Sequence, residues 1–152
     1  PTGMAAKRMK ASTGKEAKTI HKLIEYNPAL PALTLNEDNP LPYDFVIVDE
    51  LSMVDIDTMA MLLRAVCSDT QLLLLGDVNQ LPSIGPGEVL HDMINSGIFQ
   101  VTALKRSFRH GARRTILDNA NRVLEGSTEL DFGHSDCVFY NVPDSSASRK
   151  CC

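Results

Sequence analysis

The stretch Phe45-Val46-Ile47-Val48-Asp49-Glu50 decides the fold class of this chain. Its first four residues are apolar and three of them are β-branched, which is typical of a short strand buried on both faces of a parallel sheet. The run Gln71–Leu75 has the same character. Between the two runs, apolar side chains recur at helical spacing over residues 55–66, and Asp55 is suited to cap the start of that helix. A strand, a helix and a second strand predict an α/β fold with a mostly parallel sheet flanked by helices.

The rest of the chain gives weaker signals. A helix is expected over residues 88–96, ended by Gly97, and a strand over residues 98–104. Another helix is expected over residues 114–125, with these apolar side chains facing inward: Ile116, Ala120, Val123 and Leu124. Residues 27–43 are predicted to form a loop and residues 138–140 an edge strand. We expect a main domain over residues 1–130, followed by the edge strand and a polar tail over residues 131–152.

Length and composition are those of an ordinary globular chain. The 152 residues are about one domain's worth, with 43% hydrophobic and 22% charged residues. No apolar run approaches the roughly 18 residues that a membrane span needs, and the first residues show no signal pattern. We therefore expect a cytoplasmic protein without a membrane partner. The four cysteines have neither metal-ligand nor disulfide spacing.

Charge is distributed unevenly along the sequence. The chain carries 15 basic and 19 acidic residues, a net charge of −4, which by itself argues against nucleic-acid binding. Yet residues 1–22 hold six basic residues and one acid, residues 23–63 hold eight acids and no base, and residues 104–122 again hold six basic residues and one acid. Two interpretations stay open for the basic blocks: solvated surface charge, or contact with phosphates.

Acidic residues follow both predicted strands. Asp49-Glu50 comes directly after the first strand, and Gly76-Asp77 comes after the second, with Gln80 three residues further on. Ligands of open α/β sheets lie at the carboxyl ends of the strands. An aspartate there can hold Mg²⁺ while an adjacent glutamate orients the attacking water in nucleotide hydrolysis, and a side-chain amide can contact a terminal phosphate. The alternative is that these residues are chance acids and polar turn residues.

Longer motifs around these residues resemble those of a known family. Val48–Asp55, Gly76–Gly87 and Phe108-Arg109 resemble motifs II, III and IV of superfamily 1 helicases, most closely the RecD-like branch that includes the alpha chain of exodeoxyribonuclease V. Residues 1–8 resemble motif Ia of that family, and residues 19–26 resemble its motif Ib. The resemblance implies a RecA-like first motor domain of a DNA helicase, with the fold of a P-loop NTPase core.

The resemblance also implies roles for individual residues. Asp49 would hold Mg²⁺ and Glu50 would polarise the hydrolytic water. Gln80, with Asp77 beside it, would read the γ-phosphate of ATP, and Arg109 would reach the same phosphate. Single-stranded DNA would run along these residues: Thr2, Gly3, Lys7, Arg8, Thr19 and His21. Such a protein uses ATP and Mg²⁺, moves along DNA from 5′ to 3′ in recombination or repair, and can join other subunits of a helicase–nuclease complex.

The sequence also departs from the family's pattern. A glycine-rich phosphate loop ending in Gly-Lys-Ser/Thr precedes motif Ia in the family, and residues 1–152 do not contain one. Thr13-Gly14-Lys15-Glu16 is no substitute, because Glu16 stands where a Mg²⁺-binding hydroxyl is required. We therefore expect a piece of the motor domain, truncated on its N-terminal side, that binds no nucleotide and hydrolyses no ATP by itself.

Two other functions stay open at this point. A related nucleotide-driven motor without unwinding activity would share the acidic residues and Gln80, whereas a non-enzymatic module would only bind DNA or a partner. In the family, the strand that leads into the phosphate loop lies beside the strand at Leu72–Leu75. Without it, that strand has an unpaired edge, which is expected to pair with the 98–104 strand or with a second copy of the chain.

Overall fold

The computed structural model describes residues 1–29, 34–104, 115–133 and 137–139. By its internal contacts the chain divides into two compact units, Pro1–Val101 and Thr102–Cys152. Arg109 lies outside the described residues, as does Tyr140 of the predicted edge strand. None of the helices in the described ranges has the length and apolar character needed to cross a membrane.

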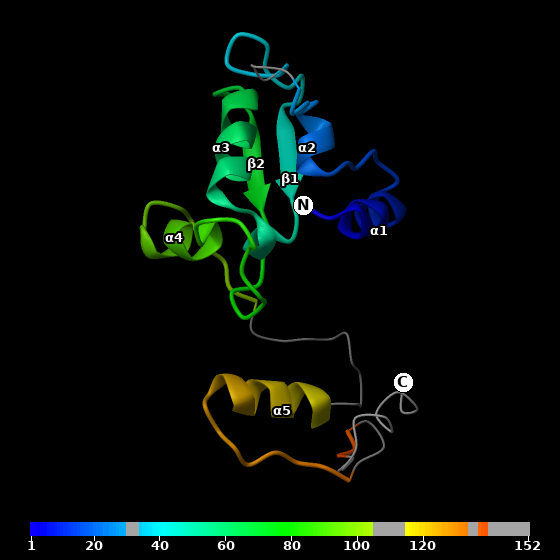
Figure 1. Ribbon diagram of the computed structural model, residues 1–152, viewed down its shortest axis with the longest axis vertical. Coiled ribbons are helices and arrows are strands. Elements are labelled where there is room, and N and C mark those ends of the chain that lie inside the picture. Colours follow the sequence, from blue (N-terminus) through cyan, green and yellow to red (C-terminus); the bar gives the residue numbers. More distant parts are fainter. Residues whose placement is uncertain (30–33, 105–114, 134–136, 140–152) are drawn as a thin grey trace. The chain divides into compact units, whose positions relative to one another are not determined.

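The first unit alternates helices and strands (Figure 1). Along the chain its elements are α1 (Gly3–Thr13), α2 (Ile20–Leu23), β1 (Phe45–Val48), the short 3-10 helix η1 (Leu51–Met53), α3 (Ile56–Ala65), β2 (Gln71–Leu74) and α4 (Val89–Asn95). The strands predicted over 45–48 and 71–75 and the helices predicted over 55–66 and 88–96 are confirmed to within one residue at each end. Helix α1 was not expected, because its apolar residues form no clear stripe and none of its side chains is fully buried.

The two strands form a parallel sheet, as predicted. Phe45 pairs with Gln71 and Val48 pairs with Leu74, with α3 as the crossover between the strands. Backbone hydrogen bonds continue the pairing past both ends of the strands: Gln71 N–H donates to Asp44 O at 2.9 Å, and Leu75 N–H donates to Val48 O at 2.8 Å. This α/β arrangement with a small parallel sheet confirms the coarse fold class.

The core lies on one face of the sheet only. Val46 and Val48 are buried in a cluster that also contains Ile24, the C-cap of α2, and Leu62 of α3. The alternate residues of β1 face the other way, and Phe45 is 51% exposed. The expectation that both strands are buried on both faces is therefore wrong for the described part of the chain. The cause is that the apolar side chains of α2 and α3 gather on the Val46 and Val48 side.

The predicted strand over residues 98–104 is absent from the structure. Gly97, with φ of 66°, ends α4, and the segment after it has no regular secondary structure and pairs with neither β1 nor β2. Its apolar side chains are exposed to solvent: Ile98 is 82% and Leu104 is 93% exposed. The edge of β2 is therefore not closed by this segment. The dimer of the chain stays a prediction.

The second unit is built around α5 (Thr115–Leu124), which confirms a helix in this region. Its predicted inward face is wrong: Ile116, Val123 and Leu124 are more than half exposed, whereas the polar Asn119 is buried. The Asn119 amide is paired with the backbone of Asp131, donating to its oxygen at 2.6 Å and accepting from its nitrogen at 2.8 Å. This two-way pairing explains why a polar side chain takes the buried position. Val138 and Phe139 lie outside any strand.

Candidate nucleotide and DNA site

The carboxyl ends of β1 and β2 bring the predicted nucleotide residues to one edge of the sheet. The strands are parallel, so the segments that leave them begin side by side (Figure 1). Leu51 N–H donates to Leu75 O at 2.9 Å, which ties the segment after β1 to the end of β2. Asp49 and Glu50 therefore lie at the same edge as Asp77, as the sequence predicts.

Glu50 has an unusual backbone conformation. Its φ of 58° and ψ of 45° lie in the left-handed region, which costs a residue with a β-carbon about 1–2 kcal/mol. The backbone N–H of Glu50 donates to Asp49 Oδ1 at 3.0 Å, and Glu50 O accepts from Met53 N–H at 3.1 Å at the start of η1. Strained backbone of this kind collects at functional sites.

Gln80 sits at the end of a tight turn that begins at Asp77. The Asp77 side chain accepts from Asn79 N–H at 3.0 Å, and the Asp77 carbonyl accepts from Gln80 N–H at 3.2 Å. Asp77 therefore shapes the turn that presents Gln80. This is a positional role in addition to the one that the sequence suggested.

The segment from Ser83 to Gly87 packs against the start of α3. Pro86 O accepts from Ile56 N–H at 2.9 Å, and Ser83 Oγ donates to Gly85 O at 2.8 Å. Asp55 caps α3 as predicted, because its Oδ1 accepts from Thr58 N–H at 2.7 Å. That hydrogen bond is the main cause that lowers the pKa of Asp55 below its ordinary value, and the charge of His21 contributes in the same direction.

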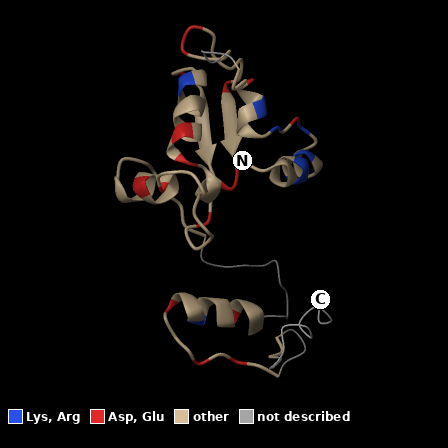
Figure 2. Cartoon of the chain, in the orientation of Figure 1, with Lys and Arg blue, Asp and Glu red and all other residues tan. Residues whose placement is uncertain are grey.

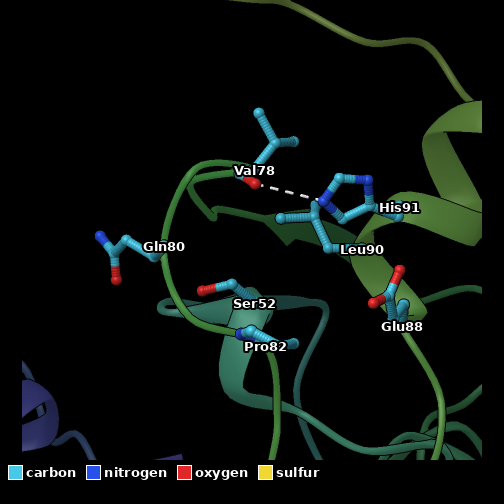
Figure 3. Close-up of a pocket in the computed structure, with 7 residues that line it drawn as sticks. All are labelled: Ser52, Val78, Gln80, Pro82, Glu88, Leu90 and His91. Atoms are coloured by element: carbon cyan, nitrogen blue, oxygen red, sulfur yellow. Dashed lines mark hydrogen bonds between the residues drawn. The ribbon is translucent and has the colours of Figure 1, made fainter. Parts of the chain in front are cut away.

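A small cavity of about 160 Å³ lies under the turn that carries Gln80 (Figure 3). Its lining comes from η1, the turn and α4: Ser52, Val78, Gln80, Pro82, Glu88, Leu90 and His91. Ser52 Oγ is buried there without a hydrogen-bond partner. His91 Nε2 lies 3.2 Å from Val78 O. The sequence did not indicate Ser52 or His91 as site residues, because a single serine and a single histidine form no recognisable motif.

The predicted DNA residues lie on α1 and α2. Thr2 and Thr19 are the N-caps of these helices, and their hydroxyl oxygens accept from Ala5 N–H and Lys22 N–H. Because each hydroxyl acts as an acceptor in its cap, its own hydrogen stays available for donation to a phosphate. Gly3 has nothing within 4 Å of where a β-carbon would stand, so its exposed backbone is open to a ligand.

Basic residues also lie on these two helices (Figure 2). Lys7 and Arg8 are exposed on α1, as a phosphate contact requires. Lys10 is ion-paired with Glu16, which lowers the pKa of that carboxyl. His21 of α2 packs edge-on against Tyr26, with ring centroids 5.4 Å apart. The structure thus brings Thr19, His21 and an aromatic ring together on one exposed segment.

The DNA-side and nucleotide-side residues meet near the start of α1. The pKa of the Pro1 amino group is lowered by partial burial, and the charges of Asp49 and Glu50 act on it in the opposite direction. Pro1 therefore lies within electrostatic range of both carboxylates. This places the N-terminal end of α1 beside the end of β1.

The donor set at the sheet edge fits a Mg²⁺ ion held through nucleotide phosphates. Mg²⁺ in such sites needs only one or two protein carboxylates. Asp49 Oδ1 is occupied by one hydrogen bond from Glu50 N–H, which leaves its second carboxylate oxygen available as a ligand. The described residues contain no group of three acidic, histidine or cysteine side chains, so they form no metal site independent of a nucleotide.

Comparison with known proteins agrees with this geometry. The model of the AAA domain family matches residues 1–86, which include α1, both strands and most of the segment after β2. The chain belongs to the AAA domain family. The chain is similar to the ATP-dependent RecD2 DNA helicase of Deinococcus radiodurans, with 36% identity over 126 residues. It is also similar to the RecBCD enzyme subunit RecD of Mycolicibacterium smegmatis, with 35% identity over 148 residues. The resemblance to RecD-like helicases is therefore confirmed.

The chain spans only a minor part of the length of these relatives. The matches cover 83% of this chain but 17% of the Deinococcus protein, and 86% of this chain but 27% of the Mycolicibacterium protein. The RecD subunit of Haemophilus influenzae matches over a shorter range, with 40% identity over 79 residues, which is 52% of this chain and 12% of the relative.

Proposed function

We propose that this chain forms part of an ATP-dependent DNA helicase or translocase that acts in recombination or repair. One observation carries the proposal: the parallel pairing of β1 and β2 brings Asp49-Glu50 and the Asp77–Gln80 turn to one edge of the sheet. The similarity to RecD-like helicases over most of the chain supports it. The intact helicase is used below for the whole protein to which these residues would belong.

The proposed nucleotide roles of Asp49, Glu50 and Gln80 are supported by their place at this edge, and that of Arg109 rests on the sequence resemblance alone. Asp49 binds Mg²⁺ through its free carboxylate oxygen, and Glu50 orients the attacking water. Gln80 contacts the γ-phosphate from the end of its turn, and Arg109 contributes a positive charge to the same phosphate. When bound, Mg²⁺ neutralises the negative charge that develops on the phosphates.

The DNA roles fall to α1 and α2. The cap hydroxyls of Thr2 and Thr19 donate to phosphates, Gly3 allows close approach of the backbone, and Lys7, Arg8 and His21 add charge and a ring on which a base stacks. Because Pro1 lies within electrostatic range of Asp49 and Glu50, the DNA-binding helix starts next to the nucleotide site. ATP hydrolysis at the nucleotide site can then act directly on DNA that is bound to α1.

Further properties are proposed on the similarity alone. Movement runs from 5′ to 3′, the parent acts in the cytoplasm, and it joins other subunits of a helicase–nuclease complex in the manner of exodeoxyribonuclease V. Residues 1–152 by themselves contain no Gly-Lys-Ser/Thr loop to hold the β- and γ-phosphates, so they do not hydrolyse ATP alone.

The test is DNA-stimulated ATP hydrolysis and strand unwinding by the intact helicase and by its Glu50→Gln variant. The variant should lose about a hundredfold or more of its turnover but keep ATP binding, because Asp49 still holds the metal. Asp57→Asn, which changes an exposed acid on α3, is the matched control and should behave like the wild type. Near-normal turnover of Glu50→Gln would remove Glu50 from the mechanism.

Two other results would point to the alternative functions. DNA-stimulated hydrolysis without unwinding indicates a motor of another kind. DNA binding without any hydrolysis by the intact protein indicates a non-enzymatic module.

A further inference from the structure

The turn that carries Gln80 has one side-chain link to a neighbouring element. The hydrogen bonds at Asp77 close the turn on itself. Within the part of the chain that the structure describes, the segment 77–82 is hydrogen-bonded to another element through one contact, between His91 of α4 and the Val78 carbonyl. The two atoms are 3.2 Å apart (Figure 3). Because a carbonyl can only accept, the Nε2 atom of His91 must carry the hydrogen and donate it.

Helix α4 provides a fixed base for this contact. Val89 at its start is buried in the core, and Leu90 packs on Gly76 so closely that a β-carbon there would stand 2.9 Å from Leu90 Cδ2. The same β-carbon would stand 3.3 Å from Ser52 N, so η1 closes on Gly76 as well. The first turn of α4 is thus locked against the two segments that carry the predicted catalytic residues.

We propose that His91 is a positioning residue that holds the Gln80 turn at the distance from the sheet edge where its amide meets the γ-phosphate. The proposal rests on the proposed function for the role of Gln80. His91 itself touches no substrate and acts through the backbone of Val78. Without its hydrogen bond, the turn keeps its own internal bonds but loses its link to α4 over the cavity lined by Ser52 and Leu90.

The experiment compares four variants of the intact helicase. His91→Ala removes the donor. His91→Gln keeps an N–H at the reach of imidazole Nε2, whereas the amide of His91→Asn stops at the position of Nδ1. Asn95→Ala is the matched control, because Asn95 is exposed on the same helix and does not line the cavity.

Two readouts are measured for each variant. The first is the hydrogen-exchange rate of the backbone amides in residues 76–81, which reports the anchoring directly. It should rise by about three- to tenfold in His91→Ala and His91→Asn, as expected for loss of one partly exposed hydrogen bond, and stay near wild type in His91→Gln and Asn95→Ala. Unchanged exchange in His91→Ala, or equal exchange in all three His91 variants, overturns the proposal.

The second readout is kcat for ATP hydrolysis in the wild-type and Gln80→Ala backgrounds. His91→Ala should lower kcat by about three- to tenfold in the wild type and by nothing further in Gln80→Ala, with ADP affinity unchanged because ADP has no γ-phosphate. An equal further loss in Gln80→Ala contradicts the proposal. If Gln80→Ala itself leaves kcat unchanged, the assigned role of Gln80 is wrong, and the exchange rates still decide whether His91 anchors the turn.

Discussion

Gly85 lies directly against the carboxylate of Asp55. A β-carbon at position 85 would stand 2.6 Å from Asp55 Oδ2 and 2.7 Å from Asp55 Cβ. Asp55 is at the same time the N-cap of α3, and the neighbouring Pro86 O accepts from Ile56 N–H. The segment after β2 is therefore fixed to the start of α3 by close packing and by a backbone hydrogen bond.

This contact predicts that Gly85→Ala destabilises the protein. The added methyl group meets the Cβ of Asp55 as well as its carboxylate, so rotation of the side chain does not relieve the overlap, and we expect a loss of about 1–3 kcal/mol. Urea unfolding followed by circular dichroism measures it. Gly3→Ala is the matched control, since a β-carbon at Gly3 meets nothing within 4 Å. Equal stability of the two variants would contradict the prediction.

The capping role of Asp55 predicts a pH dependence of stability. The pKa of Asp55 is lowered in the folded protein, so the unfolded chain binds more protons as the pH falls. The stabilisation is present above the ordinary pKa of 3.8 and is lost as the pH falls through the lower, folded value. Unfolding experiments from neutral pH to about pH 3 should show this loss in the wild type.

Two variants separate the cap from the charge. Asp55→Asn still caps α3 but does not titrate, so its stability should depend less on acid pH than that of the wild type. Asp55→Ala loses the cap and should be less stable by about 0.5–2 kcal/mol at neutral pH. Equal acid dependence in wild type and Asp55→Asn would assign the effect to other carboxyls.

The left-handed backbone of Glu50 predicts that Glu50→Gly raises the stability of the protein. The same change removes the carboxylate that orients the attacking water, so ATP hydrolysis should fall. Glu50→Gly removes the β-carbon that disfavours φ of 58°, so the free energy of unfolding should rise by up to about 1 kcal/mol. Glu50→Gln keeps the strain and should leave stability unchanged. Thermal unfolding of both variants, together with ATP hydrolysis by the intact helicase, is the measurement. A Glu50→Gly variant less stable than Glu50→Gln would contradict the predicted gain, with the higher chain entropy of glycine outweighing the relief of strain.

The exposed basic side chains of α1 predict salt-dependent DNA binding by the intact helicase. Lys7→Gln and Arg8→Gln should each lower the slope of log K against log salt by up to about one unit, because each contact with phosphate releases a counterion. Fluorescence anisotropy with labelled single-stranded DNA measures the slope. Arg64→Gln, an exposed change on α3, is the control. An unchanged slope in all three would assign Lys7 and Arg8 to solvated surface charge.

Local sequence pattern predicted the parts of the fold that depend on local chemistry. The β-branched run at 45–48 and the Asp55 cap carry their own signals, and both are confirmed. The 98–104 segment has the same apolar character but pairs with neither β1 nor β2, and pairing is a tertiary property that a sequence window does not contain. The burial of Asn119 could not be predicted for the same reason, because its partner Asp131 lies twelve residues away along the chain.

Some features of the candidate site could likewise be predicted from the sequence, and others depend on tertiary packing. Asp49, Glu50, Asp77 and Gln80 follow strands, so the sheet edge they share could be foreseen from the sequence. The left-handed φ of Glu50, the contact of Gly85 with Asp55 and the hydrogen bond from His91 depend on how separate segments pack. Helix α1 could not be foreseen either, since it is held by the Thr2 cap and not by an apolar stripe.

The parallel pairing of β1 with β2 sets the order in which this unit folds. Its partners, such as Phe45 and Gln71, are 26 positions apart along the chain, whereas α3 forms through contacts of three or four residues. A ladder between distant segments must pay the entropy of closing the chain between them, so it forms after the local helix has shortened that distance. We therefore expect the sheet edge with Asp49, Glu50 and Asp77 to be assembled late in folding. A form of this unit in which β1 and β2 are unpaired would not hold these three side chains at one edge.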